Sequence, residues 1–249
     1  MTRSPGIELT PDERAVFERD GFVGPFTYAS REQMAVLCRA IERDVLDDQA
    51  PDSLHRFESR HRDCRVAYDI CADEQLVGRV ASILGQNVLL WNSVFFCKGP
   101  GGREVPWHQD RDFLFLDPCV NVAVWLAIDR SSPVNGCLQV IPGSHAQLVP
   151  HLPRAWTHQF IARADPRFVD KERAVSVPLE SGQFILFHKD ILHHSETNLS
   201  VERRVGMVIR YTVPGVKVND DGLKAAQHVY CVRGEDSIRS NPLAAPPAS

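Results

Sequence analysis

Several features are scarce or missing in this sequence of 249 residues, and each absence excludes a class of protein. No apolar run approaches the roughly 18 to 20 residues that cross a bilayer, and Met1 to Pro5 lacks the apolar stretch of a secretory signal. The seven cysteines form no Cys-x-x-Cys pair, which argues against a zinc knuckle or a dithiol redox motif. Lys and Arg number 28 against 32 Asp and Glu, so nucleic acid is not an expected partner. We expect a cytoplasmic protein with a small-molecule substrate and no membrane partner.

Helix signals dominate the first third of the chain. Thr10-Pro11-Asp12-Glu13 and Ser30-Arg31-Glu32-Gln33 both fit a capping box, the first with Pro at the first helical position. Apolar residues after Ser30 recur at three- and four-residue steps, as on the buried face of a helix. A third helix is predicted from Asp73 towards Gly85.

Short β-type runs replace the helices from Asn87 onward. Turn clusters rich in Gly, Pro, Ser and Asn separate these runs, which is typical of an antiparallel sandwich or barrel. Helices first and strands afterwards predict an α+β fold. Segment 145–170 has little periodicity, so it is either a lid or substrate loop or an ordinary surface excursion. The predicted strands are Val88–Cys97, Val120–Ile128, Cys137–Ile141, Ala174–Leu179, Gln183–Phe187 and Val205–Val213.

The chemistry-bearing pattern is Trp107-His108-Gln109-Asp110, combined with a histidine far downstream in Leu192-His193-His194-Ser195. Residues i and i+2 of an extended segment share a face, so His108 and Asp110 can point at one metal ion. Two imidazoles and one carboxylate form the facial ligand set of non-haem iron(II) oxygenases, which leaves three coordination positions open.

The same alternation places His193 and His194 on opposite faces, so only one of them can be the third ligand. Ser195 shares a face with His193. Asn198 and Arg204 follow in a predicted hairpin and returning strand, and an arginine there can hold a carboxylate through two hydrogen bonds.

The sequence resembles the phytanoyl-CoA dioxygenase-like family of iron(II)/2-oxoglutarate oxygenases over roughly residues 12 to 214. Four stretches carry the resemblance, in the family's order and spacing. They are Trp107-His108-Gln109-Asp110, Val124 to Asp129, Asn135 to His145 with its Pro-Gly-Ser-His end, and His193 to Asn198 with Arg203-Arg204 beyond it.

The resemblance implies a double-stranded β-helix, a cupin-like jelly roll, as one domain over 1–249. Its parts would be a helical segment at about 10–85, a jelly-roll core at about 87–214 and an extension at 215–249. The implied cofactors are Fe(II), 2-oxoglutarate and O2. The implied iron ligands are His108, Asp110 and His193, and the implied 2-oxoglutarate residues are Arg204 rather than Arg203, with Asn92, Ser195 and Trp125.

Several residues also have purely structural interpretations. Trp125 can be core filling, and Asn92 can serve backbone groups. Within the resemblance His145 belongs to a structural turn, and His188 is only a weak ligand candidate. A basic cluster could bind an anionic group of the substrate, although Glu58, Asp63 and Asp69 could neutralise it. The cluster comprises His55, Arg56, Arg60, His61, Arg62 and Arg65, with Arg103 and Arg111 as further candidates.

The expected activity is hydroxylation of a small organic metabolite with release of succinate and CO2. Halogenating relatives replace the carboxylate ligand with a small residue, and this chain keeps Asp110. Desaturation, cyclisation and epimerisation use the same ligands and stay open. Alternatives of other classes are a non-catalytic jelly-roll binding protein and a zinc or manganese hydrolase or isomerase of cupin architecture.

Overall fold

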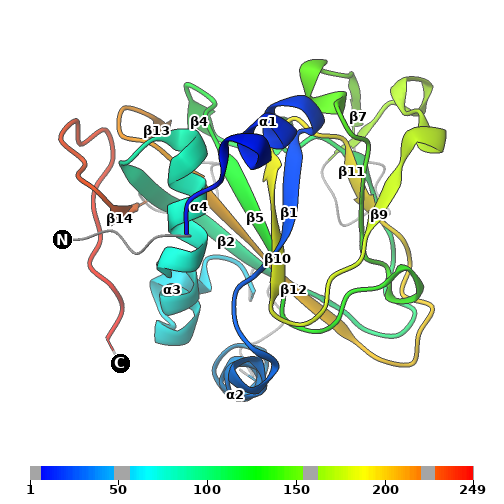
Figure 1. Ribbon diagram of the computed structural model, residues 1–249, viewed down its shortest axis with the longest axis horizontal. Coiled ribbons are helices and arrows are strands. Elements are labelled where there is room, and N and C mark those ends of the chain that lie inside the picture. The colour runs from blue at the N-terminus through cyan, green and yellow to red at the C-terminus, as the bar shows by residue number, and fades with distance from the viewer. Residues whose placement is uncertain (1–6, 48–56, 154–161, 220–227, 249) are drawn as a thin grey trace.

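A computed structural model describes residues 7–47, 57–153, 162–219 and 228–248. Two antiparallel sheets face each other, and helices cover the outer side of the larger one (Figure 1). In Figure 1 helices α3 and α4 lie to the left, while strands β9 and β11 of the smaller sheet lie to the right. The predicted α+β jelly roll is therefore confirmed.

The helices begin where the sequence predicts them. Thr10 caps α1 (Pro11–Asp20) and Ser30 caps α2 (Arg31–Ile41), each with both hydrogen bonds of a capping box. A π-helical turn, Glu42–Leu46, extends α2. Asp73 caps α4 (Glu74–Leu84), which ends at Gly85 as predicted. The short helix α3 (Arg65–Cys71) has no side-chain cap bond, and the sequence analysis did not foresee it.

The larger sheet has six strands in the order β1-β10-β5-β12-β2-β14. Its centre is the pairing of β12 with both β5 and β2, so β12 is hydrogen-bonded along both edges. The strands are β1 (Phe22–Thr27), β2 (Val88–Lys98), β5 (Val122–Ala127), β10 (Gln183–His188), β12 (Arg204–Thr212) and β14 (Tyr230–Arg233).

The smaller sheet has four strands in the order β3-β11-β6-β9. They are β3 (Val105–His108), β6 (Leu138–Val140), β9 (Val175–Val177) and β11 (His193–Ser195). Two further pairs join β4 (Leu116–Asp117) to β13 (Lys217–Val218) and β7 (His151–Pro153) to β8 (Ala162–Ala164).

Three segments differ from the sequence expectations. Strand β1 lies within the part expected to be helical, and β14 lies within the expected extension, yet both join the larger sheet at opposite edges. The β7–β8 hairpin falls in the weakly patterned stretch 145–170, of which 154–161 lie outside the described residues. The organisation of 1–249 as one domain stays a prediction.

Alternating side chains of the larger sheet enter two different cores. Val124 of β5 and Ile209 of β12 pack against the helices. Trp125 and Val208, one residue away on the same strands, pack in the space between the sheets. Because side chains alternate along a strand, even-numbered residues of β12 from Arg204 to Arg210 face the space between the sheets. The functional residues lie on that inner face.

No helix in the described part of the chain is both long enough and apolar enough to cross a membrane.

Candidate active site

Three predicted metal ligands converge between the sheets. His108 ends β3 and His193 begins β11, and the two residues are direct cross-strand partners. Asp110 Oδ1 lies 3.5 Å from His108 Nε2 and 3.6 Å from His193 Nε2. The chain is extended at Gln109 and turns into a 3-10 helix at Asp110, so His108 and Asp110 share a side as predicted. All three side chains are buried.

Both imidazoles are held in the tautomer that a metal requires. His108 Nδ1 lies 2.7 Å from the carbonyl oxygen of Pro106, and His193 Nδ1 lies 3.0 Å from that of Ile191. A carbonyl only accepts, so each Nδ1 carries the hydrogen and each Nε2 presents a lone pair. Burial, and next the neighbouring His108, lower the pKa of His193 to about 3, so this ring is neutral at pH 7.

Arg210 of β12 holds the Asp110 carboxylate through hydrogen bonds to Oδ2, the oxygen that does not face the two histidines. Its Nε and one terminal nitrogen donate to Asp110 Oδ2 at 3.2 and 3.0 Å, which leaves Oδ1 for the two histidines. Burial opposes ionisation of Asp110, and the Arg210 charge is the largest of the effects that outweigh burial and lower the pKa of Asp110. Sequence analysis missed Arg210. The sequence indicates a role for it only through its position six residues beyond Arg204, which places both arginines on the same face of the strand.

Asn92 contacts Arg210 and Glu58, and its predicted role in 2-oxoglutarate binding stays a prediction. Its side-chain oxygen accepts a hydrogen bond from Arg210 at 2.8 Å, and its side-chain nitrogen donates to Glu58 at 3.3 Å. Asn92 is not among the residues that line the cavity. The structure therefore places it behind Arg210, and its predicted contact with 2-oxoglutarate gains no support.

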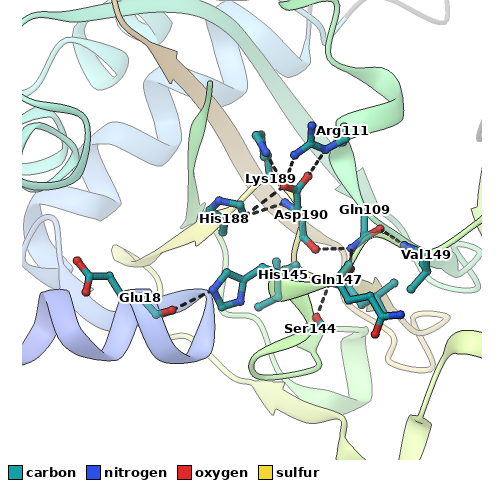
Figure 2. Close-up of polar contacts among 12 residues, drawn as sticks. Glu18, Gln109, Arg111, Ser144, His145, Gln147, Val149, His188, Lys189 and Asp190 are labelled. Carbon is teal, nitrogen blue, oxygen red and sulfur yellow. Dashed lines mark hydrogen bonds and ion pairs between the residues drawn. The ribbon is translucent and has the colours of Figure 1, made fainter. Parts of the chain in front are cut away.

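A polar network clamps the two ligand-bearing segments together (Figure 2). The Gln109 side chain points away from Asp110. Its Nε2 donates to the backbone carbonyls of Gln147 and Asp190, at 2.9 and 2.6 Å. Arg111 forms two hydrogen bonds, of 2.8 and 2.6 Å, with the Asp190 carboxylate, as Figure 2 shows. Asp190 precedes His193 by three residues, so the network ties the segment before His193 to the segment of His108 and Asp110.

The neighbouring histidines have other roles. His145 bonds the Glu18 carbonyl through Nε2 at 3.0 Å, and His188 accepts from the backbone of Asp190 at 3.1 Å. His194 is buried, and its ring stacks on Trp107 with centroids 5.0 Å apart. His193 lies with His108 and Asp110 in one group of possible metal ligands, whereas His194 lies with Glu104 and Glu196 in a separate group, as the alternation argument expects of two residues on opposite sides of the strand.

One cavity of about 720 Å³ contains the three ligand candidates. Such a volume suits a small organic ligand. Phe96, Leu138, Phe187 and Val208 give it apolar walls. Its charged lining is mostly basic, with Lys98, Arg103, Arg204 and Arg210 beside the single carboxylate Asp110.

Arg204 lies at the end of this cavity with its guanidinium over the Trp125 ring, 5.3 Å from the centroid. One terminal nitrogen donates to the Gly136 carbonyl at 2.7 Å. Arg204 Nε and Trp125 Nε1 are buried without a hydrogen-bond partner in the described ranges. Burial lowers the pKa of Arg204 to about 10, as expected for a guanidinium group largely removed from water. A carboxylate of the ligand fits this need.

The Trp125 ring packs directly against Gly206, which has no side chain. A Cβ on Gly206 would lie 2.4 Å from two atoms of the Trp125 ring. Any larger residue would therefore push the ring into the cavity below Arg204. The absence of a side chain at 206 is part of how β12 and β5 shape this pocket.

The predicted pocket residue Ser195 also lines the cavity, and Lys98 lies beside it. Lys98 Nζ donates to Ser195 Oγ at 2.8 Å. The sequence analysis missed Lys98, because a single lysine before a Gly-Pro-Gly-Gly turn resembles any surface lysine. The structure buries it, with 8% of its surface exposed.

The basic cluster does not reach this cavity. Arg60 pairs with Asp63 at 3.0 Å, and Arg65 pairs with Asp69 at 2.7 Å. Arg62 contacts the carbonyl of His228 at 3.5 Å. Arg60, Arg62, Arg65 and Arg111 are absent from the cavity lining, while His55 and Arg56 lie outside the described residues. Local carboxylates and carbonyls thus engage Arg60, Arg62 and Arg65, whereas the further candidate Arg103 does line the cavity.

Comparison with known proteins points in one direction. The profile of the phytanoyl-CoA dioxygenase (PhyH) family matches residues 17–206. A phytanoyl-CoA dioxygenase of Arabidopsis thaliana is 33% identical over 159 residues, covering 63% of this chain and 54% of the relative. Phytanoyl-CoA dioxygenase 1 of Oryza sativa is 36% identical over 110 residues, which cover 43% of this chain and 39% of the relative. The chain spans about half the length of the curated relatives it matches.

Solved structures give the same result. The non-haem monooxygenase ThoJ without ligand is 27% identical, with a TM-score of 0.76, and the match covers 94% of this chain and 88% of ThoJ. CytC3 with Fe(II) and 2-oxoglutarate is 25% identical, with a TM-score of 0.75, and the match covers 96% of this chain and 94% of CytC3. EctD from S. alaskensis with 2-oxoglutarate and 5-hydroxyectoine, at 21% identity and a TM-score of 0.71, shares the fold over 88% of this chain and 81% of EctD.

Proposed function

Because the chain belongs to the phytanoyl-CoA dioxygenase family, we propose that it is an iron(II)- and 2-oxoglutarate-dependent oxygenase that hydroxylates a small organic metabolite. One arrangement of residues supports the proposal: a two-histidine, one-carboxylate cluster shares a cavity with the buried Arg204, whose Nε has no hydrogen-bond partner among the described residues. A zinc or manganese hydrolase would need the metal-binding cluster, but its reaction would not need the buried arginine.

His108 Nε2, His193 Nε2 and Asp110 Oδ1 would hold the iron on one side. The donor set fits iron(II), because two neutral imidazoles and one carboxylate leave three positions open. When bound together, iron(II) and 2-oxoglutarate supply the reduction of dioxygen coupled to decarboxylation of the oxo acid to succinate. The protein's own contribution is to fix ligand orientation through the carbonyls of Pro106 and Ile191 and through Arg210.

Arg204 would bind the distal carboxylate of 2-oxoglutarate, with the Ser195 hydroxyl and the Trp125 Nε1 hydrogen beside it. The aromatic and aliphatic walls of the cavity exclude water from the reacting end and leave room for a substrate that does not bind the metal. Low dielectric strengthens the contact of Arg204 with a carboxylate.

Hydroxylation is the favoured outcome because Asp110 retains the carboxylate ligand. The similarity to ThoJ, a non-haem monooxygenase, supports the same outcome. Desaturation, cyclisation and epimerisation differ from it in the mass of the product, so the same experiment separates them.

The test is a screen of small metabolites, scored by substrate-dependent succinate formation with Fe(II), ascorbate and 2-oxoglutarate under air. A productive substrate should gain about one oxygen atom in mass. Loss of two hydrogens would assign desaturation or cyclisation to this site instead, and an unchanged mass would assign epimerisation. Absence of succinate both with and without substrates, from protein that binds iron, would contradict the oxygenase proposal and favour a non-catalytic binding protein.

A further inference from the structure

A second group of potential metal ligands lies beside the candidate active site. One ring nitrogen of His194 and one carboxylate oxygen each of Glu104 and Glu196 lie within 4.8 Å of one another. None of these three residues belongs to the cluster of two histidines and one carboxylate that would hold iron. The function proposed above therefore gives this second group no role.

The pairing of β11 with β3 brings the three side chains together. His194 and Glu196 are two residues apart on an extended segment, so they share one side of it. Strand β11 pairs antiparallel with β3 through Ser195 and Val105. One step further in the same register places Glu196 opposite Glu104. The His-x-Glu pattern on this side of β11 thus uses the same alternation as the His-x-Asp pattern of the predicted iron ligands.

The two carboxylates of this group repel each other, and nearby cations do not pair with them. Like charges directly opposite each other on neighbouring strands are destabilising. Within the described ranges, neither Glu104 nor Glu196 forms an ion pair of 4.0 Å or less with a lysine or arginine. The Lys98 ammonium donates instead to the Ser195 hydroxyl and to backbone carbonyls. A cation bound between the two carboxylates would remove their repulsion.

His194 provides independent evidence for a ligand at this place. The residue is only 3% exposed, and neither of its ring nitrogens has a hydrogen-bond partner in the part of the chain that the structure describes. Nε2 lies 3.1 Å from Glu196 Oε1, but this contact does not have hydrogen-bond geometry. A buried polar group without a partner is costly. Because Nε2 faces the Glu196 carboxylate, a cation between the two would give the ring a partner.

The ligand types and their spacing fit zinc(II). Imidazole and carboxylate ligands bind zinc at about 2.0 to 2.2 Å, so two of them in a tetrahedral site lie roughly 3.3 Å apart. The 3.1 Å between His194 Nε2 and Glu196 Oε1 is close to that spacing. Stacking on Trp107 holds the imidazole, while the exposed Glu104 side chain can adjust to the ion. Three protein ligands would leave one position for water.

We propose that His194, Glu196 and Glu104 form a second divalent cation site, with zinc(II) as the ion that fits it. None of these residues takes part in the proposed function, so either proposal can fail without the other. Glu104 follows the turn 99–102, which lines the cavity and exchanges two backbone hydrogen bonds of 2.9 Å with Asn198. A cation shared by Glu104 and the β11 segment would hold this turn in place, so its occupancy would fix one wall of the cavity.

The first experiment counts zinc ions by calorimetry at equilibrium, because a site with two exposed ligands should empty on dialysis. Wild type should bind two equivalents of Zn(II), the second more weakly than the first. H194A, E104Q and E196Q should keep the first equivalent and weaken the second at least about 10-fold, since even partners behind a ligand are worth roughly 10- to 100-fold. H193A should show the reverse and keep only the weaker equivalent.

E202Q is the matched control. Glu202 is an exposed glutamate six residues beyond Glu196, and it belongs to neither group of potential ligands found among the described residues. E202Q should bind two equivalents with wild-type affinity. A single equivalent in wild type, as expected if His194 and Glu196 form only an ion pair, would overturn the proposal. So would a second equivalent that persists unchanged in E104Q and E196Q. If H194A does not fold, these two exposed variants decide.

The second experiment locates the ion. Crystals of the wild-type protein soaked in Zn(II) should show an anomalous difference peak between His194 Nε2 and Glu196 Oε1, separate from a peak at His108, Asp110 and His193. No peak beside His194, or a second peak elsewhere on the surface, would overturn the proposal. A peak beside His194 without one at the other three residues would support this inference and contradict the proposed function.

Discussion

The two ends of the cavity differ in how far the protein itself satisfies its polar groups. At the metal end, both Nδ1 atoms, Asp110 Oδ2 and the Gln109 side-chain amide have protein partners. At the Arg204 end, two cations share a region whose buried nitrogens include atoms without partners in the described ranges. The metal end is preorganised by the fold, and the Arg204 end is organised to receive an anion.

Removing a metal ligand tests the first half of this comparison and should have the largest effect. H193A should lower metal affinity by more than about 100-fold, because even partners behind the ligands are worth roughly 10- to 100-fold. Succinate formation should fall below detection. Metal content after dialysis, measured by atomic absorption, checks the result.

The matched control is H194A, one residue along the same strand, where the His194 ring stacks on Trp107 and not beside Asp110. It should retain about one equivalent of metal. Loss of metal in H194A with retention in H193A would show that β11 presents the other histidine to the metal.

Replacing Arg204 tests the second half. R204M removes a charge-assisted contact worth roughly 1.5 to 3 kcal/mol, so the Kd for 2-oxoglutarate should rise about 10- to 150-fold while metal content stays unchanged. R203M is the control, because Arg203 pairs with Glu42 on the outside of the sheet. A similar rise in both variants would contradict the assignment of Arg204 as the anchor.

Replacing Arg210 separates the two ends. R210M leaves Asp110 without the donor that fixes Oδ2, so metal affinity should drop roughly 10- to 100-fold. At saturating metal, the Kd for 2-oxoglutarate should change less than about 2-fold. A defect in 2-oxoglutarate binding as large as that of R204M would mean that Arg210 serves the co-substrate rather than the carboxylate ligand.

The clamp behind the ligands should give the smallest effect. R111M removes a partly exposed ion pair with Asp190 and leaves Lys189 as the remaining partner of that carboxylate. The free energy of unfolding should fall by about 1 kcal/mol, read from a urea denaturation midpoint. R130M, at an exposed pair with Glu180, is the control and should change stability less. Equal effects would deny the clamp a stabilising role.

The sequence predicted the parts of the site that local patterns encode. The His-x-Asp tripeptide and the alternation at His193 and His194 depend on neighbouring residues, and the capped helices depend on residues three apart. Lys98 and Arg210 were missed because their roles depend on the register between β2 and β12, which pairs Lys98 with Arg204 and Asn92 with Arg210 across more than 100 residues. The same register explains Asn92, which lies opposite Arg210 and bonds to it rather than to the cavity.

The basic cluster was uncertain for a related reason. Arg60 and Arg65 each have a carboxylate three or four residues away, which the sequence shows, but which partner a charge takes depends on tertiary packing. Arg111 found its partner 79 residues away at Asp190, and no local pattern points there.

Strand β11 has only three residues, and two of them, His193 and Ser195, lie on one side of the strand while His194 lies on the other side, with its ring stacked on Trp107. Inserting or deleting one residue in it would exchange the inner and outer positions together. Metal retention and co-substrate recognition would then be lost in a single event. Substitutions can adjust one of these properties at a time, whereas changes in the length of this strand cannot, so variation in length among functional homologues should be confined to the turns that flank it.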